Sequence, residues 1–379
     1  MEILRRVRQG CFVTRRHGVE TMRKLGPLFL LLGLAGCVPP VSTGGSGGQQ
    51  STGQVARPWP VLTRKHVDLW LHGYAMLLRD TSTVPVFRRG YREQIQAAKS
   101  QRNVSTLLDA NRDRLQSRLS LSPALVNGQF APLYFSSFDQ MRQVIGLFLQ
   151  AQGNPGATND PTLRQFFAVL ASSFPTAADR EWLRLFTESL EDERQKFYES
   201  YWTSQNGARL GVVRAADSLW QGTYRAKLQR YLSNTQQETG DFILALTLGG
   251  EGRTVNFGTR QNAVAVTMPD HDPYEAFYVF AHEVVNAIVT TAVNDNTTPT
   301  EQRAGVSARY STAGTVRAGA MLFAKAAPEL VPGYTRYYLS QAGLSTSGDV
   351  NARLVSTFPL PDAIRQAIER QLDVVLGGI

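Results

Sequence analysis

The sequence predicts a mainly helical α+β protein, and three observations lead to that prediction. From about residue 60 to 234 the apolar residues recur at helical spacing, without a convincing strand. A glycine-punctuated region at 242–268 then carries three runs of strand length. Helical patterns return from Tyr274 onward. We therefore expect a helical domain at 60–235 and a second domain at 236–379 that contains a small β-sheet.

The first 36 residues have the composition of a secretion signal, so they are excluded from the fold. Arg23 and Lys24 precede an apolar run at 28–34 that is too short to span a bilayer as a helix. The run leads into Leu34-Ala35-Gly36-Cys37, which resembles the lipobox of bacterial lipoproteins. That resemblance implies cleavage before Cys37, which then carries a lipid that includes palmitate. An ordinary cleaved signal is the alternative, and Met22 is an alternative start.

A lipid on Cys37 implies attachment to a membrane of the bacterial cell envelope, facing the periplasm or the exterior. Residues 38–58 are Gly, Ser, Thr, Gln and Pro with almost no bulky apolar side chain. This composition is typical of a flexible tether, which we place at 37–59. No aspartate follows the cysteine as an inner-membrane retention signal, which favours the outer membrane; the choice between the two membranes stays open.

The charge and cysteine content exclude several classes of function. The formal charge of +9 falls to +4 after residue 36, because 33 basic and 29 acidic residues remain. No Lys/Arg-rich patch stands out, so we predict no nucleic-acid partner. The two cysteines are Cys11 and Cys37. The processed chain therefore has neither a disulfide nor a cysteine nucleophile.

The first domain is predicted to consist of helices, over 61–78, 104–119, 138–152, 162–173, 177–202 and 208–232. His66 and His72 lie on different sides of the first helix. We interpret both as side chains of a helix layer whose hydrogen bonds are satisfied within the protein. The fifth helix is acidic, and we interpret its carboxylates as a solvated face with i, i+4 ion pairs: Glu188, Glu191, Asp192, Glu193 and Glu199.

The second domain begins with three predicted strands, at 242–248, 253–257 and 262–268. The glycines around the second strand do not form a phosphate loop, because the Gly-Lys-Ser/Thr ending is absent. Helices follow, and their bounds are predicted as 274–293, a start at Thr298, 314–327, 334–341 and 362–376. Thr298-Pro299-Thr300-Glu301 is a capping-box signature. Residues 342–358 are predicted to be a surface loop.

The predicted helix at 274–293 is apolar on every face, which indicates a buried helix. Its middle nevertheless carries His282, Glu283 and Asn286. A buried carboxylate is costly unless it is hydrogen-bonded, paired with a charge or beside a metal. The helix therefore predicts either a polar network or an active site in the core.

The run His282-Glu283-x-x-Asn286 differs in one residue from the zinc-binding pattern His-Glu-x-x-His. Residues 242–339 resemble the zincin metallopeptidases, in particular the gluzincins, in which an edge strand, a His-Glu helix and a helix with a ligand glutamate follow in order. The resemblance implies His282 as first zinc ligand, Glu283 as general base and Glu301 as downstream ligand. Asn286 stands where the second histidine is expected, and an amide oxygen is a poorer zinc ligand than imidazole.

Several interpretations stay open. The His-Glu pair is a core pair satisfied by hydrogen bonds, or a zincin-like site that has lost its metal, or the centre of a peptidase that tolerates Asn286; Glu301 serves equally well as a cap. We expect a degenerate or weakly active zinc metallopeptidase. The alternative is a non-catalytic envelope lipoprotein that holds a peptide or protein partner in the groove beside its strands. The oligomeric state is not predicted.

Overall fold

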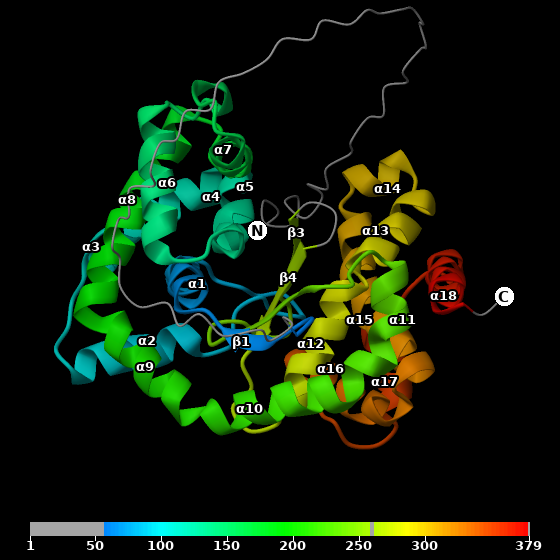
Figure 1. Cartoon of the computed structure of the whole chain (residues 1–379). Coiled ribbons are helices and arrows are strands. Elements are labelled where there is room, and N and C mark those ends of the chain that lie inside the picture. The colour runs from blue at the N-terminus through cyan, green and yellow to red at the C-terminus, as the bar shows by residue number, and fades with distance from the viewer. Residues whose placement is uncertain (1–56, 258–260, 378–379) are drawn as a thin grey trace, which may run out of the picture. The chain divides into compact units, whose positions relative to one another are not determined.

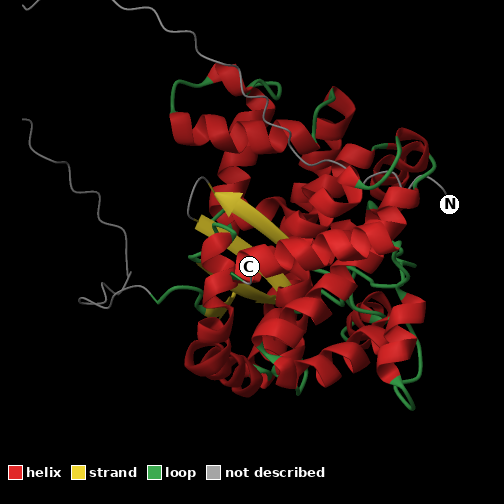
Figure 2. Ribbon diagram, turned by 90° about the vertical axis from the view of Figure 1, so that its right-hand side faces the viewer, coloured by secondary structure: helices red, strands yellow, loops and turns green. Residues whose placement is uncertain are grey.

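The structure is a computed structural model that describes residues 57–257 and 261–377 (Figure 1). It is mainly helical with one small sheet, which confirms the predicted fold class (Figure 2). The strands are β1 (Val61–Thr63), β2 (Gly240–Ala245), β3 (Arg253–Phe257) and β4 (Gln261–Thr267). Their order in the sheet is β1-β2-β4-β3, with β1, β2 and β4 parallel and β3 antiparallel to β4.

Helices cover both faces of this sheet, because alternate residues of β2 belong to different hydrophobic cores. Phe242 and Leu244 pack with the C-terminal helices, whereas Ile243 and Ala245 pack with the N-terminal helices. All four side chains are fully buried. A strand that is buried on both faces reads as an uninterrupted apolar run, which is the pattern that predicted this strand.

The N-terminal helices surround α1, which is buried along nearly its whole length. Trp70 of α1 packs edge-on against Phe186, with ring centroids 4.9 Å apart. This layer comprises α1 (Lys65–Leu77), α2 (Tyr91–Gln101), α3 (Leu107–Ala110), α4 (Arg112–Leu121), α5 (Pro123–Asn127), η3 (Gly128–Tyr134), α6 (Phe138–Gln150), η4 (Pro155–Ala157), α7 (Pro161–Ser173), α8 (Ala177–Glu193), the π-helical η5 (Arg194–Tyr198) and α9 (Glu199–Ala208).

The C-terminal helices surround the His-Glu helix. The aromatic rings of Trp220, Phe242 and Phe280 meet here, with Phe242 and Phe280 4.5 Å apart. This layer comprises α10 (Leu210–Leu219), the π-helical η6 (Trp220–Tyr224), α11 (Arg225–Asn234), α12 (Tyr274–Val284), α13 (Asn286–Asp295), α14 (Pro299–Arg303), α15 (Val306–Ala326), η7 (Pro328–Leu330), α16 (Val331–Gln341), α17 (Val350–Thr357) and α18 (Asp362–Leu376).

Several predicted elements differ from the structure; the helix predicted at 104–119, for example, is divided into α3 and α4. Residues 61–63 were predicted to begin a helix but form β1, which pairs with β2 from Val61↔Phe242 onward. The predicted loop at 342–358 contains α17, which Asp349 caps through the amide of Ala352. The predicted helix at 274–293 is interrupted at Val285, because the carbonyl of Val284 accepts hydrogen bonds from two side chains outside the helix.

Residues 58–377 form one compact unit. The predicted boundary between residues 235 and 236 falls between α11 and β2. Because β1 comes from the first segment and the other three strands from the second, the sheet joins the two segments. The division into two domains stays a prediction.

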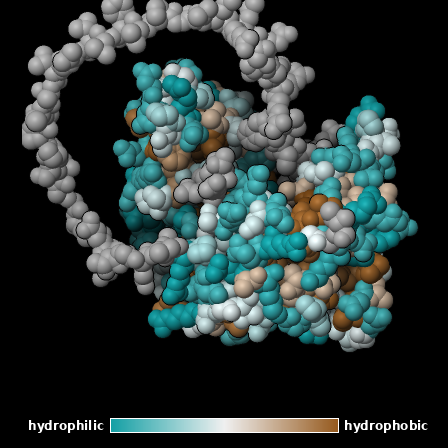
Figure 3. Space-filling view, turned by 45° about the vertical axis from the view of Figure 1, so that its right-hand side comes forward, coloured by the Kyte–Doolittle hydropathy of each residue, from teal (hydrophilic) through white to brown (hydrophobic). Residues whose placement is uncertain are grey.

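The surface shows no extended apolar area among the described residues. The exposed large apolar side chains belong to separate elements: Leu107, Leu121, Leu147, Leu210, Leu344, Val355 and Val374. Figure 3 shows one face, on which hydrophilic side chains predominate between smaller apolar areas. Tyr274–Asp295 is long and apolar enough to cross a membrane, but 78% of its most apolar window is buried in the protein. We interpret it as a core helix.

Candidate functional site

The His-Glu pair lies in the core, where α12 passes under the sheet. Nδ1 of His282 is 2.8 Å from Oε1 of Glu283, and the two side chains are 6% and 4% exposed. Since a carboxylate oxygen accepts, Nδ1 of His282 donates. The other ring nitrogen, Nε2, is buried without a hydrogen-bond partner among the described residues.

The carboxylate of Glu283 also accepts a hydrogen bond from the backbone N–H of Gly252, at 2.9 Å. Burial alone would raise the pKa of Glu283, but the hydrogen bonds from His282 and Gly252 outweigh it and hold the pKa below the usual range. A Cβ at Gly252 would lie 2.0 Å from the carbonyl oxygen of Ala265. Only glycine lets the backbone approach β4 and Glu283 this closely.

Two tyrosines of α16 complete the attachment of the loop between β2 and β3. Tyr338 stacks on the ring of His282 at 5.4 Å and donates a hydrogen bond to the carbonyl of Gly250 at 3.0 Å. Tyr337 donates to the carbonyl of Gly249 at 3.2 Å. The His-Glu pair and these tyrosines therefore fix the backbone that leads into β3.

The other predicted metal ligands contact groups outside the His-Glu pair. Asn286 begins α13, after the interruption at Val285, and its side chain is 3.5 Å from the hydroxyl of Thr290. Glu301 is at the surface of α14 and forms the predicted capping box with Thr298, which lowers the pKa of its carboxyl group. Within the described residues, no three His, Cys, Asp or Glu side chains gather as a metal site would require. Zinc binding by these residues stays a prediction.

Strand β3 forms an open edge of the sheet, and the opposite edge is covered. In the described chain no other backbone segment bonds to the outer side of β3. At the β1 edge, by contrast, the side chain of Asp217 on α10 accepts the backbone N–H of Val61 at 3.2 Å. Asn256 of β3 is exposed, and Val255 is buried against the N-terminal helices. An open strand edge can accept another extended chain.

Cys37, the signal sequence and most of the tether lie outside the described residues. Their assignments stay predictions.

A second buried polar cluster, between α1, α2, α3 and α8, was not predicted. Nε2 of His72 donates to Glu193 at 3.0 Å, and Tyr91 is 3.0 Å from Nδ1. Lys99 pairs with Glu193 at 2.6 Å and with Asp109 at 2.8 Å. Burial lowers the pKa of His72, while its partners hold the pKa of Glu193 below the usual range although burial opposes this.

This cluster corrects the interpretation of Glu193 as part of a solvated face, because its side chain is fully buried. Phe186, Leu190 and Phe197 share its helix face at i−7, i−3 and i+4. That apolar spacing is the pattern in the sequence that indicates a buried position for Glu193. The interpretation of His72 as a side chain with satisfied hydrogen bonds agrees with its two hydrogen bonds in the structure.

Asp68 of α1 is a further buried carboxylate that the sequence did not single out. It accepts hydrogen bonds from the backbone N–H of Leu246 at 2.6 Å and from Nε1 of Trp202 at 2.8 Å. Burial raises the pKa of Asp68 to about 7, although these hydrogen bonds lower it in part. Asp68 thus joins the N-terminal helices to the end of β2.

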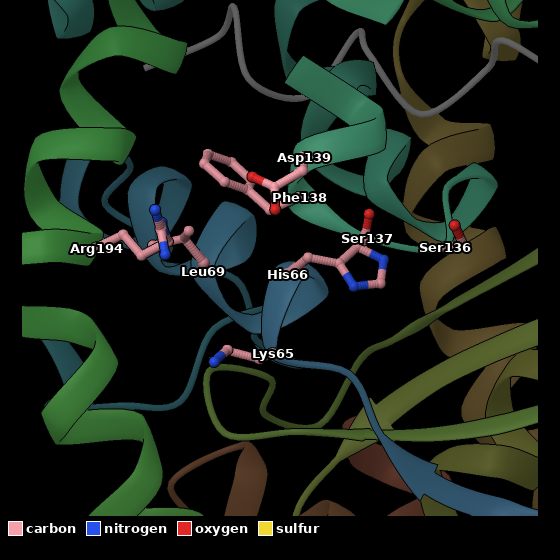
Figure 4. Close-up of a pocket in the computed structure, with 8 residues that line it drawn as sticks. All are labelled: Lys65, His66, Leu69, Ser136, Ser137, Phe138, Asp139 and Arg194. Carbon is pink, nitrogen blue, oxygen red and sulfur yellow. The ribbon is translucent and has the colours of Figure 1, made fainter. Parts of the chain in front are cut away.

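A small pocket opens at the start of α6, away from the His-Glu pair (Figure 4). Most of its polar side chains already have partners: His66 contacts the carbonyl of Phe135 at 2.9 Å, Arg194 pairs with Glu191, and Ser137 caps α6. The remaining charged group, Asp139, is exposed to solvent, so the pocket offers no buried free polar group that would select a ligand.

Comparison of the chain with protein-family models, with curated proteins and with solved structures gives no match. The function has to be argued from the geometry of the chain itself.

Proposed function

We propose that the protein is a lipid-anchored bacterial envelope protein that binds an extended segment of a partner at the open edge of β3. The observation that carries this proposal is the position of β3. It is an edge strand, and the loop that leads into it is anchored by Glu283 through the amide of Gly252. A partner strand added at this edge gains main-chain hydrogen bonds, and the rigid loop limits the ordering cost.

The same anchor argues against hydrolysis as the main activity. A general base needs a free carboxylate oxygen beside the reacting water. Oε1 of Glu283 accepts hydrogen bonds from both Gly252 and His282, and because the side chain is 4% exposed, water has little access to its other oxygen. We therefore propose that the zincin-like order of an edge strand before a His-Glu helix serves as a framework without metal chemistry.

One observation favours the metallopeptidase as a second candidate. Nε2 of His282 is buried and has no partner among the described residues, and imidazole nitrogen is a good zinc ligand. Metal analysis of protein purified without chelator separates the candidates. We expect no stoichiometric zinc. If the protein instead holds about one zinc per chain and shows proteolysis that Glu283→Gln abolishes, the metallopeptidase would replace partner binding as the proposed function.

The binding proposal is tested with a photo-crosslinking amino acid at Asn256, introduced into the full chain in cells. We expect a discrete crosslinked adduct, because Asn256 is exposed on the open edge. The matched control carries the same amino acid at the exposed Ser120 of α4. Equal adducts from both positions, or none from Asn256, would contradict the proposal.

Lipid attachment at Cys37 has its own test. Cells fed with labelled palmitate should label the protein, and Cys37→Ala should remove the label. Separation of the two membranes then tests the expected outer-membrane location. Absence of label in the unmodified chain would favour an ordinary cleaved signal.

A further inference from the structure

The described chain begins beside α10, so the structure shows where a membrane tether meets the folded body. Gln221 of η6 donates a hydrogen bond to the carbonyl of Trp59 at 2.9 Å and lies 3.4 Å from that of Pro58. Two residues further on, Val61 N donates to Asp217 of α10. These hydrogen bonds fix the exit of the tether on the helix that runs through α10 and η6.

The longer helical segment from α9 to α11 is cationic, whereas α10 and η6 themselves carry one basic residue, Arg214, and one acidic residue, Asp217. Residues 203–234 contain five basic residues and one acidic residue, Asp217, whose carboxylate is engaged by Val61. Arg209 and Lys227 pair with Asp270 and Glu329 of neighbouring elements. Arg214 is exposed and has no acidic partner among the described residues. The positive charge of Arg214 is therefore available to an external anion.

The outer side of the stretch is shaped for close approach to a flat surface. Gly207, Gly211 and Gly222 each have open space where a side chain would stand. Leu210 projects beside them and is 43% exposed. Figure 1 shows α10 at the lower border of the fold, with β1 directly above it. Gly211, Arg214 and Ser218 on this side of α10 are exposed.

We propose that α10 docks on an anionic phospholipid surface and orients the protein on its membrane. The proposal rests on the lipid anchor at Cys37. Nineteen residues lie between Cys37 and Arg57, and a Gly/Ser-rich segment of this length has an r.m.s. span of about 25 Å. Such a tether gives an effective concentration in the millimolar range, so a weak surface contact is enough. Each arginine near an anionic surface strengthens binding about fivefold.

Docking through α10 would display the partner-binding edge away from the bilayer. Strand β1 lies next to α10, and β3 lies at the far edge of the sheet, three strand spacings away. At about 4.8 Å per spacing this is about 14 Å further from the lipid. The anchored chain would then present β3 to the surrounding compartment.

The test uses the lipidated full-length mature chain in vesicles of pure phosphatidylcholine or with added phosphatidylglycerol. Ser218→Cys in α10 supplies the one free thiol for a fluorophore, because Cys37 carries the lipid. We expect quenching by nitroxide-labelled headgroups only with phosphatidylglycerol, and loss of quenching at 1 M salt. A fluorophore at Ser120→Cys, which is exposed on α4, should stay unquenched.

Arg214→Glu should lower the ratio of docked to undocked protein about 30-fold, since it changes the charge by two units. The matched control is Arg370→Glu on α18, also exposed, which should leave the ratio unchanged. Flotation with the vesicles reports the anchor separately. Protein that does not float contradicts the lipid anchor; protein that floats without quenching at Ser218→Cys, or with equal quenching on both vesicles, overturns the docking.

Discussion

Glu283 Oε1 receives two hydrogen bonds, from the ring of His282 at 2.8 Å and from the backbone of Gly252 at 2.9 Å. The two donors come from different elements, so this one oxygen ties α12 to the loop before β3. A buried carboxylate that gathers donors in this way rigidifies its surroundings. The pair that resembles a catalytic motif therefore has a structural effect that mutation can measure.

Glu283→Leu should lower the free energy of unfolding by about 2–4 kcal/mol, because it leaves two buried N–H donors without an acceptor. Glu283→Gln keeps an acceptor oxygen and should cost less. Urea denaturation measures both. Glu301→Ala, which removes only a surface cap, should destabilise less than Glu283→Leu. A Glu283→Leu protein as stable as the unmodified chain would show that the carboxylate is strained, as active-site groups often are.

Gly252→Ala should cost about 3 kcal/mol or more, because the new Cβ would stand 2.0 Å from the carbonyl oxygen of Ala265. The backbone of β3 has to move to relieve this contact, so crosslinking at Asn256 should fall as well. Gly146→Ala is the matched control: it lies within α6 and has open space around it. It should stabilise the protein by about 0.5–1 kcal/mol. Equal melting temperatures for the two variants would contradict the tight approach.

The buried cluster around Glu193 should behave as one unit. Lys99→Met leaves Glu193 and Asp109 without their shared cation and should cost about 3–5 kcal/mol. The double change Lys99→Met/Glu193→Leu removes the unpaired charge and should cost less than the sum of the single changes. A double-mutant cycle measures this coupling, which we expect to exceed about 1 kcal/mol. Additive costs would mean that the two groups act independently.

The mainly helical class and the three strands after residue 240 were predictable, because the period of the apolar residues reports which faces are buried. Strand β1 was not, because its three residues are a strand only through pairing with β2, far along the chain. The break at Val285 has a similar cause. Tyr231 and Gln237, on and after another helix, capture the carbonyl of Val284.

The candidate site was predictable in part. The buried position of His282 and Glu283 followed from the apolar helix around them, and both are buried in the structure. Their partners, Gly252 and Tyr338, could not be predicted from the sequence, because neither lies in a local pattern that indicates contact with α12. Glu301 fits the capping-box pattern that its own neighbours predicted. Burial and capping within one segment could therefore be predicted from the sequence, whereas contacts between distant segments could not.

The pH dependence of stability offers a test of the junction at Asp68. Burial raises the pKa of Asp68 to about 7, from an ordinary value of 3.8. Between pH 4 and 7 the folded state therefore holds a proton that the unfolded state has lost. Stability rises with pH only where the unfolded state binds more protons, so this group contributes the opposite slope. Its contribution is fully present below pH 4 and is lost as the pH rises to 7.

The expected size of this loss is about 4 kcal/mol over that window. Other carboxyl groups, such as Glu193, have lowered pKa values and contribute the opposite slope, so the comparison has to be made against a variant. Asp68→Asn removes the titration but places an amide N–H₂ near an N–H donor, which costs stability equally at every pH. Urea denaturation from pH 4 to 7 should therefore show the deficit of Asp68→Asn shrinking as the pH rises. A constant deficit would mean that Asp68 stays ionised throughout, held by the N–H groups of Trp202 and Leu246.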